Sequence, residues 1–515
     1  MQRNGVQMSA DTRGNRSPKV VIVGTGLGGI GLAVHLKQTG INNLVILEQG
    51  HDVGGVWRDN NYPGAACDVP STLYSYNSFK TKHNWTMRYS GQAEIQSYIR
   101  GVAEQYGLME HVRFHSKVVS ATFREETGDW SVMTEAGEEH IADVFIPAVG
   151  TLARPNLPSI PGRDNFQGPA WHSSRWNHDV PLEGKRVAVI GTGASALQFV
   201  PHVQKQAGKL TLFQRSAPYI MPYHNFSYEE GRHRIKRARP LMKLDRFLFW
   251  YVMEIGQQFL TRWLKARSVV KSMSLRHLKK QVKDPVLRAK LTPDYEFGCK
   301  RVLFSSKYYP ALTQPNVEVV TDRIEEITAK GVRTADGVEH EVDAIIYGTG
   351  FKTFDIFGHM KITGAGGTVL AEQWKEGAHA YLGMAVPNFP NMFVVYGPNT
   401  DLGSGSVLFM LESQFPYIKQ AVERIRELPA GSFVSIRHDV WKKFDDEIQG
   451  QLAKSVWVSG CSNWYRNEYG RVVTNWSQRS WRFRRRASRF ELDKYQVGTA
   501  TARQAPARVP AEGIS

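Results

Sequence analysis

Two glycine-rich turns constrain what this chain can fold into more than any other feature of its sequence. Each follows a short apolar run, residues 20–23 before the first turn and residues 187–190 before the second. A glycine-rich turn between an apolar strand and a helix is typical of a Rossmann-like β-α-β unit, which binds the pyrophosphate of a dinucleotide at the helix N-terminus. The sequence therefore predicts two such units. The first turn contains Gly24, Gly26, Gly28 and Gly29, and the second consists of Gly191, Thr192, Gly193, Ala194, Ser195 and Ala196.

The residue at the tip of the second strand of each unit distinguishes the two nucleotides. Glu48 and Arg215 each lie 24 residues after the first glycine of their turn. A carboxylate accepts two hydrogen bonds from an unmodified ribose and repels a phosphate on that ribose. A guanidinium does the reverse, because it forms charge-assisted bonds to a 2′-phosphate. The contrast predicts FAD at the first turn and NADPH at the second, where Ser216 is a further expected contact.

The length of the chain sets the expected number of domains. A protein of 515 residues and 58.2 kDa suits two or three domains. We expect an α/β fold of two Rossmann-like dinucleotide-binding domains, one for FAD and one for NADP, with a helical insertion. The expected FAD-binding domain comprises 18–150 and 382–497, the NADP-binding domain 151–217 and 301–381, the helical insertion 218–300, and disordered tails 1–17 and 498–515.

The cysteines exclude some classes of protein. Cys67, Cys299 and Cys461 form no CxxC pair and no cluster with the spacing of metal ligands. This argues against a disulfide scaffold, a metal site and a flavin-dependent disulfide reductase. Cys299 stands beside two cations, which could lower its pKa, but with no second nucleophilic partner we interpret it as structural. The polar N-terminus does not resemble a signal peptide, so we expect a cytoplasmic protein.

The positive charge of the chain is concentrated in one region. Of the net charge of +17, much arises from residues 217–300, which hold 18 Lys and Arg against 7 Asp and Glu. This region could steer a polyanionic nucleotide, contact anionic lipid or simply be a solvated helix surface. Nucleic acid is not an expected partner, because no recognised nucleic-acid module accompanies the charge.

An apolar run within the same region raises the question whether a helix there crosses a membrane. Residues 247–253 are all apolar or aromatic, but the run ends at Glu254, well short of the ~20 residues that a transmembrane helix needs. An interfacial helix is one interpretation. A buried helix, or a wall of a substrate pocket, is the interpretation that we favour, so membrane contact would be peripheral.

The segment between the two units carries a more specific pattern. Phe166, Gly168, His172 and Trp176 have the spacing of the fingerprint of type I Baeyer–Villiger monooxygenases, and this chain resembles that family. Related flavin monooxygenases that oxidise amines and sulfides typically carry Tyr at the position of Trp176. Asn177 departs from the family pattern, which has Pro or Asp there. The resemblance implies that His172 lies in a linker, away from the flavin.

Further motifs extend the resemblance from about residue 19 to residue 497. Residues 54–69 resemble the flavin-covering loop of the family, and 299–301 resemble its active-site segment. The resemblance implies FAD contacts from Gly55, Val56, Trp57, Asp68, Tyr74 and the backbone of Val118. It implies that Lys300 supports Arg215 at the 2′-phosphate, that Arg301 faces the flavin, and that Trp464 lies against NADP⁺. Taken without the family, Lys300 and Arg301 could be surface cations, Asp68 a turn carboxylate, and Trp57 and Trp464 core aromatics.

The resemblance also implies a reaction. NADPH would reduce FAD, O₂ would add at the flavin C4a, and the resulting peroxide, kept anionic, would attack the carbonyl carbon of a ketone to give an ester or lactone. Arg301 would be the catalytic cation, and Asp68 would pair with it and aim it. We expect pocket walls from 219–222, the apolar insert and 397–410. The alternatives are a flavin monooxygenase that oxidises sulfides or amines, and a non-catalytic flavin-binding or membrane-associated interaction protein.

Overall fold

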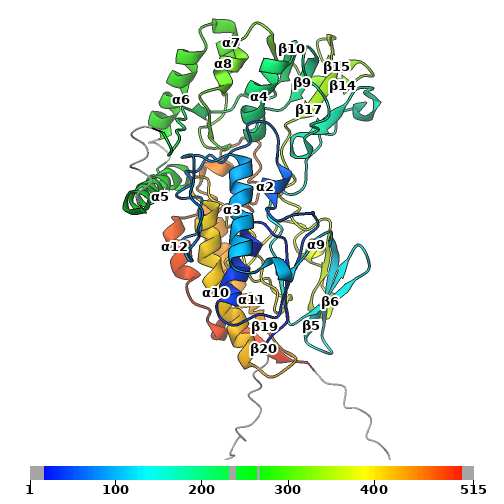
Figure 1. The fold of residues 1–515 in the computed structure, drawn as a ribbon, viewed down its shortest axis with the longest axis vertical. Helices are drawn as coiled ribbons and strands as arrows, with labels where there is room; N and C mark the ends of the chain where they lie inside the picture. Colours follow the sequence, from blue (N-terminus) through cyan, green and yellow to red (C-terminus); the bar gives the residue numbers. More distant parts are fainter. Residues whose placement is uncertain (1–16, 231–238, 264–266, 501–515) are drawn as a thin grey trace, which may run out of the picture.

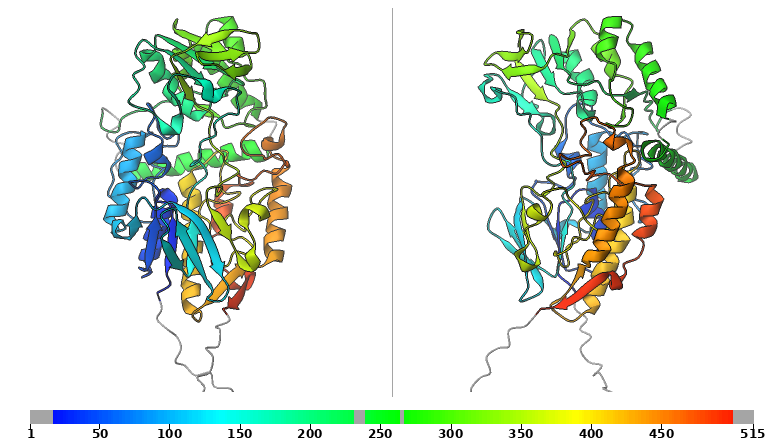
Figure 2. Two further views of the ribbon diagram at one scale, coloured as in Figure 1. Left: turned by 90° about the vertical axis from the view of Figure 1, so that its right-hand side faces the viewer. Right: turned by 180° about the vertical axis from the view of Figure 1, so that it is seen from behind.

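The computed structural model describes residues 17–230, 239–263 and 267–500. The chain forms two lobes stacked along the long axis of the molecule, and each lobe is built around a parallel sheet (Figures 1 and 2). The expected tails over 1–16 and 501–515 lie outside the described residues. The disordered C-terminal tail was expected to begin at residue 498. The structure places a strand up to Thr499, so this expected boundary is too early.

The first sheet has the order β3-β2-β1-β7, with every neighbouring pair parallel. Its strands are β1 (Val20–Val23), β2 (Leu44–Leu47), β3 (Val112–Arg113) and β7 (Val144–Pro147). Helix α1 (Leu27–Lys37) follows the first glycine turn and leads to β2. The unit predicted from the apolar periodicity is therefore confirmed, and β7 is the predicted late strand that closes it.

The second sheet repeats this arrangement in the other lobe. Its order is β13-β10-β9-β17-β8, again entirely parallel. Helix α4 (Ala194–Gln206) follows the second glycine turn. The two Rossmann-like units are confirmed. The strands are β8 (Ala170–His172), β9 (Arg186–Ile190), β10 (Lys209–Phe213), β13 (Val317–Val320) and β17 (Ala344–Tyr347).

Each unit carries an antiparallel addition before its late strand. Strands β4 (Val118–Arg124), β5 (Asp129–Thr134) and β6 (Glu139–Ala142) precede β7, and β14 (Ile324–Ile327), β15 (Gly331–Thr334) and β16 (Glu339–Glu341) precede β17. Strand β18 (Lys361–Thr363) pairs with β4. The chain has thus re-entered the first lobe by Lys361, and the expected boundary at 382 is too late because no apolar periodicity marks the crossing.

Helices cover the two sheets and form the insertion. The insertion contains α5 (Arg239–Thr261), α6 (Arg267–Gln281) and α7 (Pro285–Lys290), and it is flanked by β11 (Ile220–Met221), which pairs with β12 (Leu303–Phe304). Strands β19 (Ser432–Ile436) and β20 (Tyr495–Thr499) form a separate antiparallel pair. The other helices are α2 (Val56–Asp59), α3 (Gln92–Gln105), α8 (Tyr308–Leu312), α9 (Leu370–Gln373), α10 (Val407–Glu427), α11 (His438–Leu452) and α12 (Ser480–Arg486).

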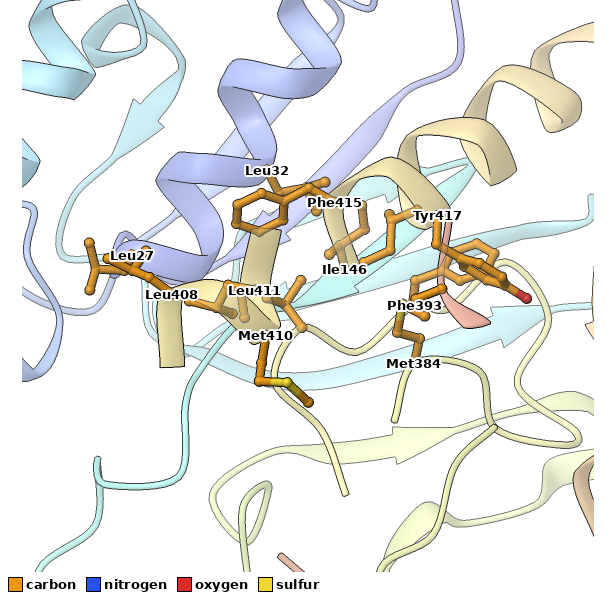
Figure 3. Packing of buried hydrophobic residues seen from close by; sticks show 14 of the residues in the cluster. Leu27, Leu32, Ile146, Met384, Phe393, Leu408, Met410, Leu411, Phe415 and Tyr417 are labelled. Carbon is orange, nitrogen blue, oxygen red and sulfur yellow. The ribbon is translucent and has the colours of Figure 1, made fainter. Parts of the chain in front are cut away.

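The core of the first lobe holds the glycine turn in place. Helix α10 lies along α1, where the two helices contribute Leu27, Leu32, Leu408, Leu411 and Phe415 to one buried cluster (Figure 3). The close approach depends on small residues on α1, since a Cβ on Gly31 would lie 2.7 Å from the Phe415 ring. The C-terminal part of the chain therefore supports the first unit, as the sequence predicts.

Candidate active site

The first glycine turn is shaped by contacts that leave no room for side chains. Gly24 has φ +107°, and a Cβ there would lie 2.7 Å from the carbonyl oxygen of Ala148, at the end of β7. A Cβ on Gly29 would lie 2.0 Å from the Gly24 carbonyl oxygen. The cap residue of α1, Gly26, makes no side-chain hydrogen bond to the helix. The first amides of α1 are thus presented to a ligand, and this cradle fits a pyrophosphate.

Glu48 lies at the tip of β2, as predicted, but its carboxylate is already engaged by the protein. It is buried, Oε2 accepts from the Thr25 amide (3.0 Å) and hydroxyl (2.6 Å), and Oε1 accepts from the Gly50 amide (2.8 Å). Arg58 Nη1 lies 2.7 Å from Oε1. These partners occupy the four acceptor positions of a carboxylate. A ribose hydroxyl must therefore displace one partner, and the sequence analysis did not foresee Arg58 in this position.

Other residues expected at FAD lie on the same side of the first lobe. Trp57 Nε1 donates to the Tyr74 hydroxyl (3.0 Å), and the two rings meet edge to face. Both line a large cavity together with Val56 and Asp68. Val118 is buried at the start of β4, near Glu48, whose carbonyl accepts from the Ser116 amide (2.8 Å). Gly55, at the cap of α2, lies within 4 Å of the turn at Gly26.

The second glycine turn repeats the geometry of the first. Gly191 has φ +109°, and a Cβ there would lie 2.4 Å from the carbonyl oxygen of Gly348, just after β17. The cap of α4 is Gly193, again without a side-chain hydrogen bond. The Thr192 hydroxyl donates to the Ser216 carbonyl (3.0 Å) and ties the turn to the end of β10. This cradle also fits a pyrophosphate.

Two cations gather beside the second turn. Lys300 Nζ donates to the Ser216 hydroxyl (2.7 Å), and Arg215 is exposed to the same cavity. Burial and the neighbouring charge of Arg215 lower the pKa of Lys300. Two like charges held this close are costly without an anion between them, so the geometry suits a ligand phosphate.

Arg301 lies where the two lobes meet. Its Nη2 donates to both oxygens of Asp68, at 2.9 and 2.8 Å. The Arg301 side chain remains 42% exposed and lines the large cavity, while Asp68 is 21% exposed. The Asp68 charge raises the pKa of Arg301 further above its already high value. Arg301 is therefore a permanent cation aimed into the cavity by a carboxylate.

A second carboxylate near Arg301 is absent from the sequence analysis. Asp401 Oδ1 accepts from the Tyr396 hydroxyl (2.7 Å) and from the Leu402 amide (2.8 Å). Burial raises the pKa of Asp401, against the opposing effects of Tyr396 and Arg301. Asp401 belongs to the segment 397–410, which the sequence indicates only as a pocket wall. No motif marks the residue, so only the fold reveals it.

The cavity joins the two sets of residues. Its volume is about 2520 Å³, well above the ~300–1,000 Å³ of a typical small-molecule pocket. It extends from Trp57 and Asp68 past Arg301 to the second turn, so it has space for more than one large ligand. The expected walls are confirmed, since Met221, Pro222, Leu402 and residues of α5 line it. Within the described residues, no group of His, Cys, Asp and Glu could hold a metal ion.

The cysteine interpretation requires a correction. Cys299 and Cys461 form a disulfide, at a sequence separation of 162. The bond connects the segment of Lys300 and Arg301 to the loop of Trp464, which lines the cavity. The absence of a CxxC pair in the sequence says nothing about cysteines brought together by the fold. Cys299 is buried, and the sequence analysis, which argued only against a disulfide scaffold, did not foresee this single bond.

The linker fingerprint lies behind the cavity wall, since the centroid of the His172 ring is 5.5 Å from that of Phe351, which lines the cavity. His172 is buried, its Nδ1 accepts from the Ser174 amide (3.2 Å), and burial lowers its pKa. Trp176 contacts the rings of Trp171 and Phe199. Neither His172 nor Trp176 lines the large cavity. His172 is therefore a packed, neutral side chain of the linker.

The comparisons with known proteins cover nearly the whole chain. The flavin-binding monooxygenase-like family matches residues 17–360. A Baeyer–Villiger monooxygenase of Streptomyces coelicolor is 42% identical over 96% of this chain and 94% of its own length. One of Pseudomonas aeruginosa is 39% identical over 97% of this chain and 95% of its own length. The structure of OTEMO with FAD and NADP has a TM-score of 0.85 at 25% identity, covering 94% of this chain and all of that one.

Proposed function

Because the chain belongs to the flavin-binding monooxygenase-like family and is an FAD- and NADPH-dependent Baeyer–Villiger monooxygenase, we propose that Arg301 is its catalytic residue. The reaction converts a ketone to an ester or lactone with one oxygen atom of O₂. One observation carries the proposal: a permanent cation, paired with Asp68, faces the cavity between the two nucleotide turns.

In this proposal, each glycine turn binds one of the two cofactors. The first turn with Gly24, Gly26, Gly29 and Glu48 would hold FAD, together with Trp57, Tyr74 and the backbone of Val118. When bound, FAD takes hydride from NADPH and supplies the reduced flavin that reacts with O₂. At the second turn, Arg215 and Lys300 would bind the 2′-phosphate, and Trp464 would cover NADP⁺. The contacts between Lys300, Ser216 and Thr192 support this assignment.

Arg301 would act by holding negative charge. As oxygen adds to a ketone, charge develops on the carbonyl oxygen, and a preorganised donor stabilises it without reorganisation. Asp68 keeps the guanidinium in position and, by its own charge, favours the charged form. Removal of one such donor typically costs ~3–4 kcal/mol of transition-state stabilisation. Arg301 is the catalytic residue of this proposal and Asp68 its positioning residue.

The test separates flavin reduction from oxygenation. We expect Arg301→Ala to retain bound FAD and its reduction by NADPH, measured by stopped-flow absorbance, and to form ester at least ~100-fold more slowly. Arg186→Ala is the matched control, because Arg186 pairs with Glu341 and Asp343 at the end of β9 opposite the glycine turn and does not line the cavity. Ester formation by Arg301→Ala at the wild-type rate contradicts the proposed role.

We also propose that the protein works in the cytoplasm and that its helical insert makes a peripheral contact with membranes. The small number of cysteines, three in the whole chain, supports the first statement. The Cys299–Cys461 disulfide is unusual for a reducing compartment, and the complete burial of Cys299 shields it from soluble thiols. Cell fractionation tests the location, and recovery outside the cytoplasmic membrane contradicts it. The membrane contact depends on the surface of α5.

A further inference from the structure

Helix α5 directs both of its acidic side chains and Arg246 toward the protein. Asp245 accepts from the Thr72 hydroxyl (2.9 Å) and Arg88 (3.1 Å), and Arg246 donates to the Thr72 carbonyl (2.7 Å). Glu254 accepts from the Ser480 amide (2.9 Å). These contacts fix the helix against the first lobe by hydrogen bonds and ion pairs.

The opposite side of α5 is apolar and exposed. Six of its side chains are between 40% and 59% exposed, and their spacing of three and four residues places them on one side of the helix. We call them the α5 outer face. Both Figure 1 and the right-hand view of Figure 2 place α5 at the outer margin of the molecule. The α5 outer face consists of Leu241, Leu244, Phe247, Leu248, Tyr251 and Val252.

Folding does not account for this arrangement. A solvated helix normally exposes its polar side, whereas α5 exposes an apolar face over several turns in addition to the apolar side chains, such as Phe249, Trp250 and Leu260, that it packs against the first lobe. The apolar exposure continues beyond the helix through Trp263, Val269 and Met273. Exposed apolar side chains gathered on one side of a helix in this way indicate an interaction surface.

The charge around the α5 outer face identifies the kind of partner. Residues 239–283 contain two acidic residues, Asp245 and Glu254, and both make the inward contacts described above. The same range also contains several exposed cations. A second copy of this chain would bring two cationic regions together, which disfavours a dimer through this face. The exposed cations of this range are Lys243, Arg262, Arg276, Lys279, Lys280 and Lys283.

The same helix lines the cavity. Val252 belongs to the α5 outer face, at 59% exposed, and it also lines the cavity, together with Phe249, Met253 and Phe259. The apolar wall of the cavity and the apolar outer surface therefore meet at Val252. No helix among the described residues has the length and apolarity required to cross a bilayer, so any lipid contact of α5 lies along the surface.

We propose that the α5 outer face seats on an anionic lipid bilayer and that the enzyme takes lipophilic, long-chain ketones from it through the adjoining cavity wall. The apolar side chains would enter the lipid interface, and the surrounding Lys and Arg would meet the headgroups, each worth ~1 kcal/mol. The substrate class rests on the proposed function, while the lipid surface does not.

The test compares vesicle binding by the full-length FAD-loaded protein and two variants. Leu244→Glu/Leu248→Glu changes the α5 outer face at positions that do not line the cavity, and Val286→Glu is the control at an exposed residue of α7. We expect wild type and Val286→Glu to float with phosphatidylglycerol vesicles at low salt, and the double variant to bind at least tenfold more weakly. Wild type should bind pure phosphatidylcholine vesicles more weakly as well.

Two activity measurements distinguish a failure of the lipid surface from a failure of the proposed function. On a water-soluble ketone the double variant should match wild type, and on a long-chain ketone dissolved in the vesicles it should be at least tenfold slower. Equal vesicle binding by the double variant, or a wild-type dimer that this variant dissociates without any vesicle binding, overturns the lipid surface. If no ketone is oxidised while vesicle binding persists, the proposed function fails and the lipid surface stands.

Discussion

At the residue scale, the buried pair of Glu48 and Arg58 is the least expected feature of the first nucleotide site. Arg58 also donates to the Asp52 carbonyl (2.6 Å) and pairs with Asp59 (2.7 Å), so one guanidinium fixes the whole end of β2. We expect Arg58→Met to leave Glu48 buried without its cation, which typically costs ~3–5 kcal/mol. Urea unfolding should show this loss, and FAD should dissociate more readily in equilibrium dialysis.

The control for Arg58→Met is the same substitution at a more exposed ion pair. Arg100 lies 2.7 Å from Asp52 but is 46% exposed, so Arg100→Met should change the free energy of unfolding by no more than ~1 kcal/mol. If Arg58→Met retains FAD and stability as well as Arg100→Met does, Glu48 does not depend on Arg58.

The specificity for the second nucleotide also belongs to the residue scale. We expect Arg215→Ala to raise the KM for NADPH by roughly 10- to 100-fold, because charge-assisted hydrogen bonds contribute ~1.5–3 kcal/mol. The KM for NADH should hardly change, since NADH has no 2′-phosphate. Steady-state kinetics with both donors measure this, and an unchanged preference for NADPH would remove the assignment of Arg215 and Lys300 to the phosphate.

At the element scale, the contact between α1 and α10 contains a titratable group. His35 lies near the rings of Phe79 and Phe415, and its Nε2 is 2.9 Å from the Ser78 hydroxyl. Burial lowers the pKa of His35 to about 4, from the usual value near 6.5. Between pH 6.5 and pH 4 the unfolded chain therefore binds a proton at His35 that the folded chain does not bind. The contribution of His35 to the free energy of unfolding is complete above pH 6.5 and is lost as the pH falls toward 4.

This linkage gives a measurable pH dependence. Between pH 7 and pH 5, His35 should account for a loss of about 2 kcal/mol in the free energy of unfolding. His35→Gln can keep the hydrogen bond to Ser78 and should lose correspondingly less stability over this range in urea titrations. A His51→Gln variant, at an exposed position, is the control. Equal pH slopes for wild type and His35→Gln would show that His35 does not titrate as described.

The elements also show what the sequence could and could not predict. Strands β1 and β9 and helices α1 and α4 were predictable, because apolar runs and glycine turns are local signals. The pairing of Cys299 with Cys461 was not, because the fold alone brings residues so distant in sequence together. The return of the chain through β18 was missed for the same reason. Asp401 and Arg58 gain their roles only from neighbours that other elements provide.

At the scale of the whole molecule, two lobes of similar fold line one cavity with different functional residues. Glu48 and Arg215 occupy equivalent positions in the two units, and from this contrast the sequence predicts FAD for the first unit and NADPH for the second. The position of Arg301 between the lobes required the structure, since its orientation depends on Asp68 of the first lobe. The exposed apolar face of α5 also emerges only in three dimensions, because the same periodicity in sequence would suit a buried helix.

The most direct measurement is oxygen-isotope labelling of the product from a ketone panel. The FAD-loaded protein is supplied with NADPH, ketone and ¹⁸O₂, and the product is examined by mass spectrometry. The account predicts an ester or lactone that carries one atom of ¹⁸O for each NADPH consumed, and little such product from Arg301→Ala. Oxidation of a thioether without any ester from the ketones, or ester that carries no label, would contradict it.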